Sequence, residues 1–151
     1  MTALIASKRR RKNGAPAYSL DAQIGFILRQ VSQRHTTLFT RGIGDDTTPT
    51  QWAALAKLLE VGPCSQNLLG RLTSMDVATI KGVVDRLTTR GLTQTQPDPG
   101  DGRRLIVALT KAGRALTEQA LAKAAAISEE TLAPLTDDER EVLITLLKKL
   151  R

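Results

Sequence analysis

One short stretch, residues 76–109 (DVATIKGVVDRLTTRGLTQTQPDPGDGRRLIVAL), changes from helical to strand-like spacing. Its first half carries apolar side chains three and four residues apart, on one face of a helix: Val77, Ile80, Val84 and Leu87. Gly91 ends that pattern, residues 92–96 alternate, and PDPGDG is dense in turn-forming residues. Apolar residues then return at every second position: Leu105, Val107 and Leu109. The stretch predicts a helix that leads directly into a β-hairpin.

A shorter helix is predicted just before this one, in QNLLGRLTSM. Ser65 can cap it, and Asp76 can cap the helix that follows. Two short helices that share an apolar seam and are separated by about four residues form a helix-turn-helix. A helix-turn-helix followed by a hairpin is a winged helix, so residues 48–109 are predicted to form such a lobe, opened by a capping box of Thr48 and Gln51.

Long amphipathic helices are predicted on both sides of this lobe. Residues 19–42 carry one apolar stripe: Ile24, Ile27, Leu28, Val31, Leu38 and Phe39. Residues 110–151 are alanine-rich up to Leu132, and a second capping box of Thr136 and Glu139 then opens a helix with Leu143, Leu146, Leu147 and Leu150 in line. These helices lack a core of their own, so a second copy of the chain is expected to cover them. The predicted fold is mainly α with a small β-hairpin wing, in one domain over residues 19–151.

The charge of the chain is concentrated near its start. The formal net charge is +7, but Lys8, Arg9, Arg10, Arg11 and Lys12 supply five of the 22 basic residues, which leaves 17 against 15 acidic residues. Residues 1–18 are predicted to form a flexible basic arm, either merely solvated or in contact with phosphates. Net charge alone therefore says little about the folded part.

Several classes of function are disfavoured. Cys64 is the only cysteine and His35 the only histidine, which excludes an intrachain disulfide and a zinc site built from these residue types within one chain. No third group is identifiable that would orient them as a nucleophile and base, and DPGDG lacks the surroundings of a phosphate-binding loop. No catalytic residue, metal or cofactor is expected. No apolar run approaches the ~18 residues of a membrane span, so a cytoplasmic location is expected.

The helix from Asp76 presents small and polar residues away from its apolar seam, among them Thr79, Lys81, Gly82 and Arg86. A major groove admits a helix, and small side chains let its backbone come close to the bases. Close packing on another helix would explain a glycine at position 82 as well as close approach to DNA does. Just past the hairpin turn, a guanidinium of Arg103 or Arg104 could enter a minor groove, with Asp101 pairing with one of them and aiming it.

The segments MDVATIKGVVDRLTTRGL and PDPGDGRRLIVALTKAGRAL resemble the recognition helix, wing and following helix of MarR-type transcription regulators, and the resemblance covers about residues 20–151. It implies a homodimeric repressor on a pseudo-palindromic, double-stranded DNA operator, released in many members by a phenolic or aromatic acid. Ser65, Gln66 and Asn67 would lie near phosphates, Thr79, Lys81, Gly82 and Arg86 would face the major groove, and Asp101, Arg103 and Arg104 match the wing. Gly102 stands where many members carry another arginine.

Two further segments, TPTQWAAL and QRHTTLF, resemble a subgroup tied to aromatic-compound catabolism. The position of the family's ligand site implies a set of effector-binding residues: Ile24, Leu28, Arg34, His35 and Trp52. Arg34 or His35 could pair with a carboxylate while Trp52 stacks on a ring. The alternative is that His35 and Trp52 are ordinary core residues.

Two other functions remain open at this point. The chain could bind nucleic acid without sequence preference through its basic arm, or it could sense oxidants through Cys64. Cys64 lies next to Ser65 and the start of a helix, a position that could lower the pKa of the thiol, although a small buried residue is the simpler interpretation.

Overall fold

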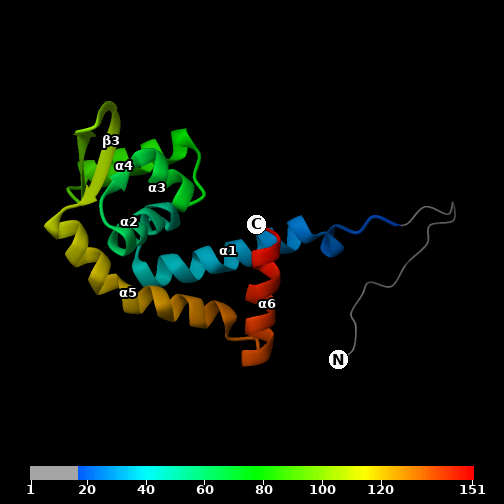
Figure 1. Ribbon diagram of the computed structural model, residues 1–151. Coiled ribbons are helices and arrows are strands. Elements are labelled where there is room, and N and C mark those ends of the chain that lie inside the picture. Colours follow the sequence, from blue (N-terminus) through cyan, green and yellow to red (C-terminus); the bar gives the residue numbers. More distant parts are fainter. Residues whose placement is uncertain (1–16) are drawn as a thin grey trace.

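A computed structural model describes residues 17–151, so most of the predicted basic arm lies outside the described residues. Along the chain the elements are η1 (Leu20–Ala22), α1 (Ile24–Ile43), α2 (Pro49–Val61), β1 (Cys64–Ser65), α3 (Gln66–Leu72), α4 (Val77–Thr89), β2 (Thr93–Asp98), β3 (Asp101–Leu109), α5 (Lys111–Leu132) and α6 (Asp137–Lys149). Figure 1 shows α2 to β3 gathered as a lobe at one end, α1 and α5 running side by side, and α6 at the opposite end.

The predicted hairpin is present and is part of a larger sheet. Strands β2 and β3 pair antiparallel, with Thr93 opposite Leu109 and Gln96 opposite Ile106, and the register shifts between Pro97 and Asp98. The two-residue strand β1 adds to the other side of β3, which gives the order β1-β3-β2. The sequence pattern predicted only the hairpin; β1 ties the start of α3 to the wing.

The core of the lobe is aliphatic, as expected for a chain with 3% aromatic residues. Its buried members come from α2, β1, α3, α4 and β3 and from the residue before β2: Ala54, Leu55, Leu58, Cys64, Leu69, Ile80, Val83, Val84, Leu87, Leu92 and Val107. The predicted apolar face of α4 was wrong at one position, because Val77 is 69% exposed while Val83 is buried. Val77 occupies the first turn, which projects beyond the core, and Val83 faces inward next to Val84. On β3, Leu105 lies near the hairpin tip and is also exposed.

The predicted helix caps are confirmed by their hydrogen bonds. The side chain of Thr48 accepts from the N–H of Gln51 and the side chain of Gln51 accepts from the N–H of Thr48, a complete capping box. Ser65 and Asp76 cap α3 and α4, and Thr136 with Glu139 forms the second capping box. The Gln51 side chain also accepts from Arg90 Nη1 at 3.1 Å, which links the start of α2 to the end of α4.

Helix α5 is fixed to the lobe where α4 passes into β2. Thr110 N–H donates to Leu92 O and Thr110 Oγ1 donates to Gly91 O at 2.6 Å. One turn into α5, Gly113 lies so close to this segment that an added Cβ would stand 1.8 Å from Leu92 O. The wing and recognition helix are thus held directly by the long helix α5.

The apolar faces of α1 and α6 are largely exposed in the single chain. Ile24, Ile27, Leu28 and Val31 on α1 are each at least 41% exposed. On α6, an apolar groove of about 490 Å³ is lined by Leu135, Asp138, Glu139, Val142, Leu143 and Leu146. These are the faces for which the sequence predicts a second copy of the chain. No helix within residues 17–151 is long and apolar enough to cross a membrane.

Candidate DNA-binding surface and effector site

The recognition helix α4 is anchored by its buried side and leaves its polar side free. Asp76 Oδ1 accepts from the N–H of Thr79 at 2.7 Å, and this hydrogen bond lowers the pKa of the Asp76 carboxyl below its usual range. Thr79, Lys81, Asp85 and Arg86 are all exposed. A capped, firmly packed helix with a polar outer face is what major-groove recognition requires.

Gly82 lies in the middle of this outer face. A Cβ added there would meet only Arg86 Nη1, at 3.8 Å, among the described residues. No other helix of residues 17–151 packs on Gly82, so the alternative of helix-helix contact within the chain has no support. Lys81 Nζ lies 2.6 Å from Asp85 Oδ2, so these side chains form an ion pair beside the glycine.

At the start of α3, the predicted phosphate-contacting residues differ in accessibility. Ser65 is buried and its Oγ accepts from Leu68 N–H, so this hydroxyl acts as a cap. Gln66 is half-buried and Asn67 is exposed. Asn67 lines a hollow of about 350 Å³ between α3 and α4, together with Arg71 and Val77. Arg71 and Val77 were not among the predicted contact residues, because helical spacing alone does not show which outer positions of two crossed helices converge.

The wing turn is held by its own aspartates. Asp98 Oδ1 accepts from Gly100 N–H at 2.8 Å and Asp101 Oδ1 accepts from Arg103 N–H at 3.1 Å. The carboxylate of Asp101 therefore fixes the backbone of the turn, whereas the sequence had suggested that it pairs with a guanidinium. Arg103 and Arg104 are both exposed at the start of β3.

Arg34 and His35 meet the last turn of α5. Arg34 donates from Nη1 to Thr131 O at 2.7 Å and from Nη2 to Glu130 O at 3.0 Å, two carbonyls in the last turn of α5; Glu130 O also accepts from Ala133 N–H at 3.3 Å. His35 Nδ1 lies 2.8 Å from Thr131 Oγ1, whose single proton is donated to Ile127 O. We therefore assign His35 Nδ1 as the donor in this contact, which leaves Nε2 as the ring nitrogen not used by it.

The other predicted effector residues are spread along the same face. Trp52 is half-buried against a small cluster of Leu38, Phe39 and Ile127. Ile127 lies one turn of α5 before Thr131, the partner of His35. Ile24 and Leu28 are exposed, and Ile24 lies eleven residues before His35, roughly 16 Å along the helix axis. One chain therefore connects Arg34, His35 and Trp52 through the end of α5, whereas Leu28 lies two turns and Ile24 three turns before His35 on α1.

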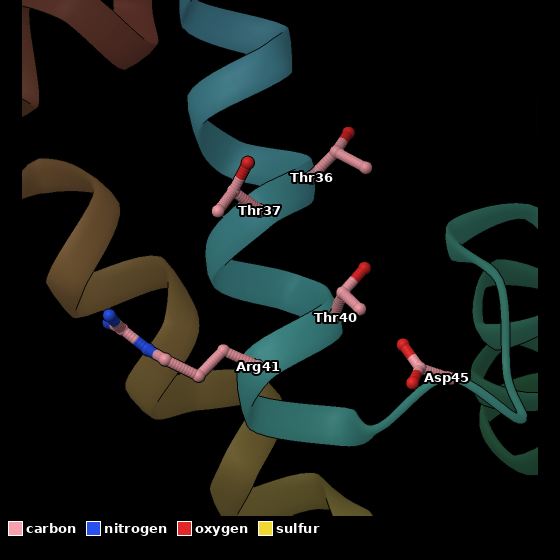
Figure 2. Close-up of a pocket in the computed structure, with 5 residues that line it drawn as sticks. All are labelled: Thr36, Thr37, Thr40, Arg41 and Asp45. Atoms are coloured by element: carbon pink, nitrogen blue, oxygen red, sulfur yellow. The ribbon is translucent and has the colours of Figure 1, made fainter.

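A polar hollow of about 470 Å³ lies beside the end of α1, lined by Thr36, Thr37, Thr40, Arg41 and Asp45. Figure 2 shows Thr36, Thr40 and Asp45 on one side of the helix, while Arg41 points to the other side, towards α5. Arg41 forms an ion pair with Glu130 there. These groups do not converge on one point, so the hollow does not supply a cationic site for a carboxylate.

Cys64 is buried on β1, and burial raises the pKa of its thiol. The suggestion that the neighbouring helix start lowers this pKa was wrong, because removal of the thiolate from water dominates. The interpretation of Cys64 as a small core residue is confirmed.

Comparison with known proteins agrees with this architecture. Residues 45–104 match the family model described as the MarR family. The HTH-type transcriptional repressor NicR of Pseudomonas putida is 40% identical over 149 residues, which cover 95% of this chain and 94% of NicR. The crystal structure of a probable transcriptional regulator from Pseudomonas aeruginosa has a TM-score of 0.85 at 60% identity, covering 88% of this chain and 100% of that one.

A further similar structure is that of BpsR from Bordetella bronchiseptica, whose DNA binding is regulated by 6-hydroxynicotinic acid. It has a TM-score of 0.80 at 37% identity and covers 85% of this chain and 98% of BpsR. The similarity to NicR extends through the helices on both sides of the lobe, well beyond the residues that match the family model. This chain therefore belongs to the MarR family and is a DNA-binding transcriptional regulator.

Proposed function

We propose that the protein is a homodimeric repressor, acting in the cytoplasm without a catalytic role, that is released from a pseudo-palindromic operator by a small aromatic acid. The observation that carries the DNA-binding part is the outer face of α4, with Thr79, Lys81, Gly82 and Arg86, followed along the chain by a hairpin that carries the exposed Arg103 and Arg104. This face enters the major groove and the wing follows the minor groove beside it. Two-fold symmetry places the half-sites roughly one helical turn, about 10 bp, apart.

The start of α3 contributes contacts to the phosphate backbone. Asn67 is exposed and Gln66 is half-exposed, so their amides can donate to phosphate oxygens. Ser65 acts indirectly, because its buried hydroxyl holds the first turn of α3 in place. Phosphate contacts fix the register of the lobe on the duplex, and α4 then supplies the sequence preference.

The effector is proposed to bind beside Arg34, His35 and Trp52. BpsR responds to 6-hydroxynicotinic acid, and NicR is a repressor of similar sequence. In this chain His35 Nδ1 is used by Thr131, so its Nε2 is the ring nitrogen that can form a hydrogen bond with a ring hydroxyl of the effector. Leu28 lies two turns of α1 before His35 on the same stripe and Ile24 one turn further, so both would extend the site along α1 towards the second copy.

Release from DNA follows if the effector changes how α1 is held against α5. The bonds of Arg34 and His35 join α1 to the last turn of α5, and the other end of α5 is bonded to Gly91 and Leu92. A carboxylate that draws Arg34 away from the carbonyls of Glu130 and Thr131 would alter the position of α5. Because α5 carries the wing and recognition helix, the spacing of the two lobes in the dimer would then change.

The test is operator release by 6-hydroxynicotinic acid, with 6-hydroxynicotinamide as a matched control that lacks the carboxylate. Fluorescence anisotropy of a labelled duplex from the DNA upstream of the protein's own gene should fall with the acid and stay unchanged with the amide. The variant His35→Ala keeps both bonds from Arg34 to α5, so it should still bind the duplex but require about tenfold more acid, on the order of the loss of one hydrogen bond. If acid and amide act equally, or if His35→Ala responds like the wild type, the proposed effector site is wrong.

A further inference from the structure

The DNA-facing side of the recognition helix carries a negative charge that its position makes unfavourable. Asp85 lies on α4 three residues after Gly82, and its side chain is 60% exposed. A carboxylate on the surface that approaches a duplex is repelled by the phosphates, which dominate the affinity of such proteins. Its presence at the centre of a recognition surface therefore needs a specific role.

The carboxylate is held next to a donor. Lys81 Nζ lies 2.6 Å from Asp85 Oδ2, and both side chains are exposed, at 64% and 60%. Between them along the helix, Gly82 leaves open space, because a Cβ added there would meet only Arg86 Nη1, at 3.8 Å, among the described residues. The pair therefore presents a hydrogen-bond donor and an acceptor side by side on the part of α4 where a backbone can come closest to bases.

Helix stabilisation alone does not explain this pair well. Ion pairs four residues apart stabilise a helix most when the acid precedes the base, and here Lys81 precedes Asp85. Exposed pairs of this kind contribute little to folding and are weakened by salt. Arg114 and Glu118 on α5 form a pair with the same spacing and the same order, away from the DNA-facing side, and they provide a natural control.

The edge of a G·C base pair has the complementary arrangement. In the major groove guanine presents O6 and N7 as acceptors, and the adjacent N4 amino group of cytosine is a donor. O6 and N4 are joined by a Watson–Crick hydrogen bond, so they lie about 2.9 Å apart, close to the 2.6 Å between Nζ and Oδ2. We propose that Lys81 and Asp85 act together as a specificity-determining pair that reads one G·C base pair in each half-site, Lys81 donating to guanine and Asp85 accepting from cytosine. This inference rests on the proposed placement of α4 in the major groove.

The charge of Asp85 leads to opposite expected effects of its removal on affinity and on base preference. Removal of the carboxylate takes away a repulsion that acts on every duplex, so Asp85→Ala should bind random-sequence DNA more tightly than the wild type. The same change removes the acceptor for cytosine N4, so preference at one base pair should fall. Affinity and specificity are thus expected to move in opposite directions.

The experiment first selects the operator from a pool of random duplexes with the full-length wild-type protein. Each base pair of one half-site of the selected duplex is then replaced in turn, and binding is measured for wild type, Lys81→Met, Asp85→Ala and the control Glu118→Ala. We expect one G·C position at which the wild type discriminates by about tenfold or more against the other base pairs. Lys81→Met and Asp85→Ala should both reduce discrimination to about threefold or less at this same position, while Glu118→Ala retains the wild-type profile.

The possible results separate this inference from the proposed function. If the wild type selects no sequence, the placement of α4 as a reading helix fails and this inference fails with it. If the wild type selects an operator but Asp85→Ala keeps every base preference, or changes affinity equally for all duplexes, only the G·C-reading pair is wrong. The pair is equally wrong if Lys81→Met and Asp85→Ala lose discrimination at different positions.

Discussion

At the scale of single residues, the approach of Gly113 on α5 to the backbone of Leu92 leaves no room for a side chain. An added Cβ at Gly113 would lie 1.8 Å from the backbone oxygen of Leu92, which cannot move aside as a flexible side chain can. We expect Gly113→Ala to lower the free energy of unfolding by about 3 kcal/mol or more, measured by urea denaturation. Gly102→Ala is the control, because a Cβ added there would meet no atom within 4 Å among residues 17–151, its two chain neighbours aside. Equal free energies of unfolding for the two variants would show that Gly113 does not lie this close to Leu92.

The cap of the recognition helix gives a prediction about pH. Hydrogen bonds from Thr79 lower the pKa of Asp76 in the folded state below the 3.8 of an unperturbed aspartate. The stabilisation from this carboxylate is therefore present above that unfolded-state pKa and is lost as pH falls through the lower folded-state value. Asparagine caps helices well without titrating. The thermal midpoint of the wild type should therefore fall relative to that of Asp76→Asn below about pH 4, while the difference between the two midpoints stays constant above pH 5. A gap that is constant throughout would mean that Asp76 does not titrate differently on folding.

At the scale of elements, helix α4 should show a conflict between stability and binding at Gly82. Alanine has a helix propensity higher than glycine by roughly 1 kcal/mol, and the space around Gly82 admits a Cβ. Gly82→Ala is therefore expected to raise the free energy of unfolding by up to about this amount while it weakens operator binding, since the helix can no longer approach the bases as closely. Stability and binding are checked by denaturation and by anisotropy on the same preparation. Operator affinity equal to that of the wild type would show that Gly82 is not at the DNA contact.

The elements that the sequence predicted best are those defined by local chemistry. Thr48, Ser65, Asp76 and Thr136 cap their helices as expected, because a cap depends only on the next three residues. Strand β1 was missed because its two residues acquire strand geometry only by pairing with Val107 and Ile106, about 40 residues away. The exposure of Val77 was missed for a related reason, since spacing assigns it to a face but does not show where the core ends.

The same distinction applies to the candidate sites. The polar face of α4 and the arginines of the wing follow from sequence, because each is defined within one element. The bonds from Arg34 and His35 to the end of α5 connect residues 96 or 97 positions apart, which no local pattern indicates. The ion pair of Lys81 with Asp85 was within reach of sequence reasoning, since residues four apart are neighbours on a helix.

At the scale of the whole molecule, dimerisation should depend on the apolar face of α6. Leu146 is 52% exposed in the single chain and lines the groove of this helix. We expect Leu146→Glu to weaken the dimer by about 3 kcal/mol or more, because a two-fold interface contains the substitution twice. Sedimentation velocity should show monomers at concentrations where the wild type is dimeric, with operator binding reduced in parallel. Val61→Glu, at the exposed end of α2, should remain dimeric; dissociation of both variants, or of neither, would place the interface elsewhere.

The central claim is that affinity for the operator comes from reading bases and not merely from attraction to phosphates. The most direct measurement is a salt titration of binding to the protein's own upstream duplex beside a scrambled duplex of the same length and composition. Both affinities should fall steeply as salt rises, because both involve phosphate contacts. We expect a gap of roughly 4 kcal/mol or more to separate the two curves at every salt concentration. Two parallel curves without a gap would contradict it and would favour binding through the basic residues alone.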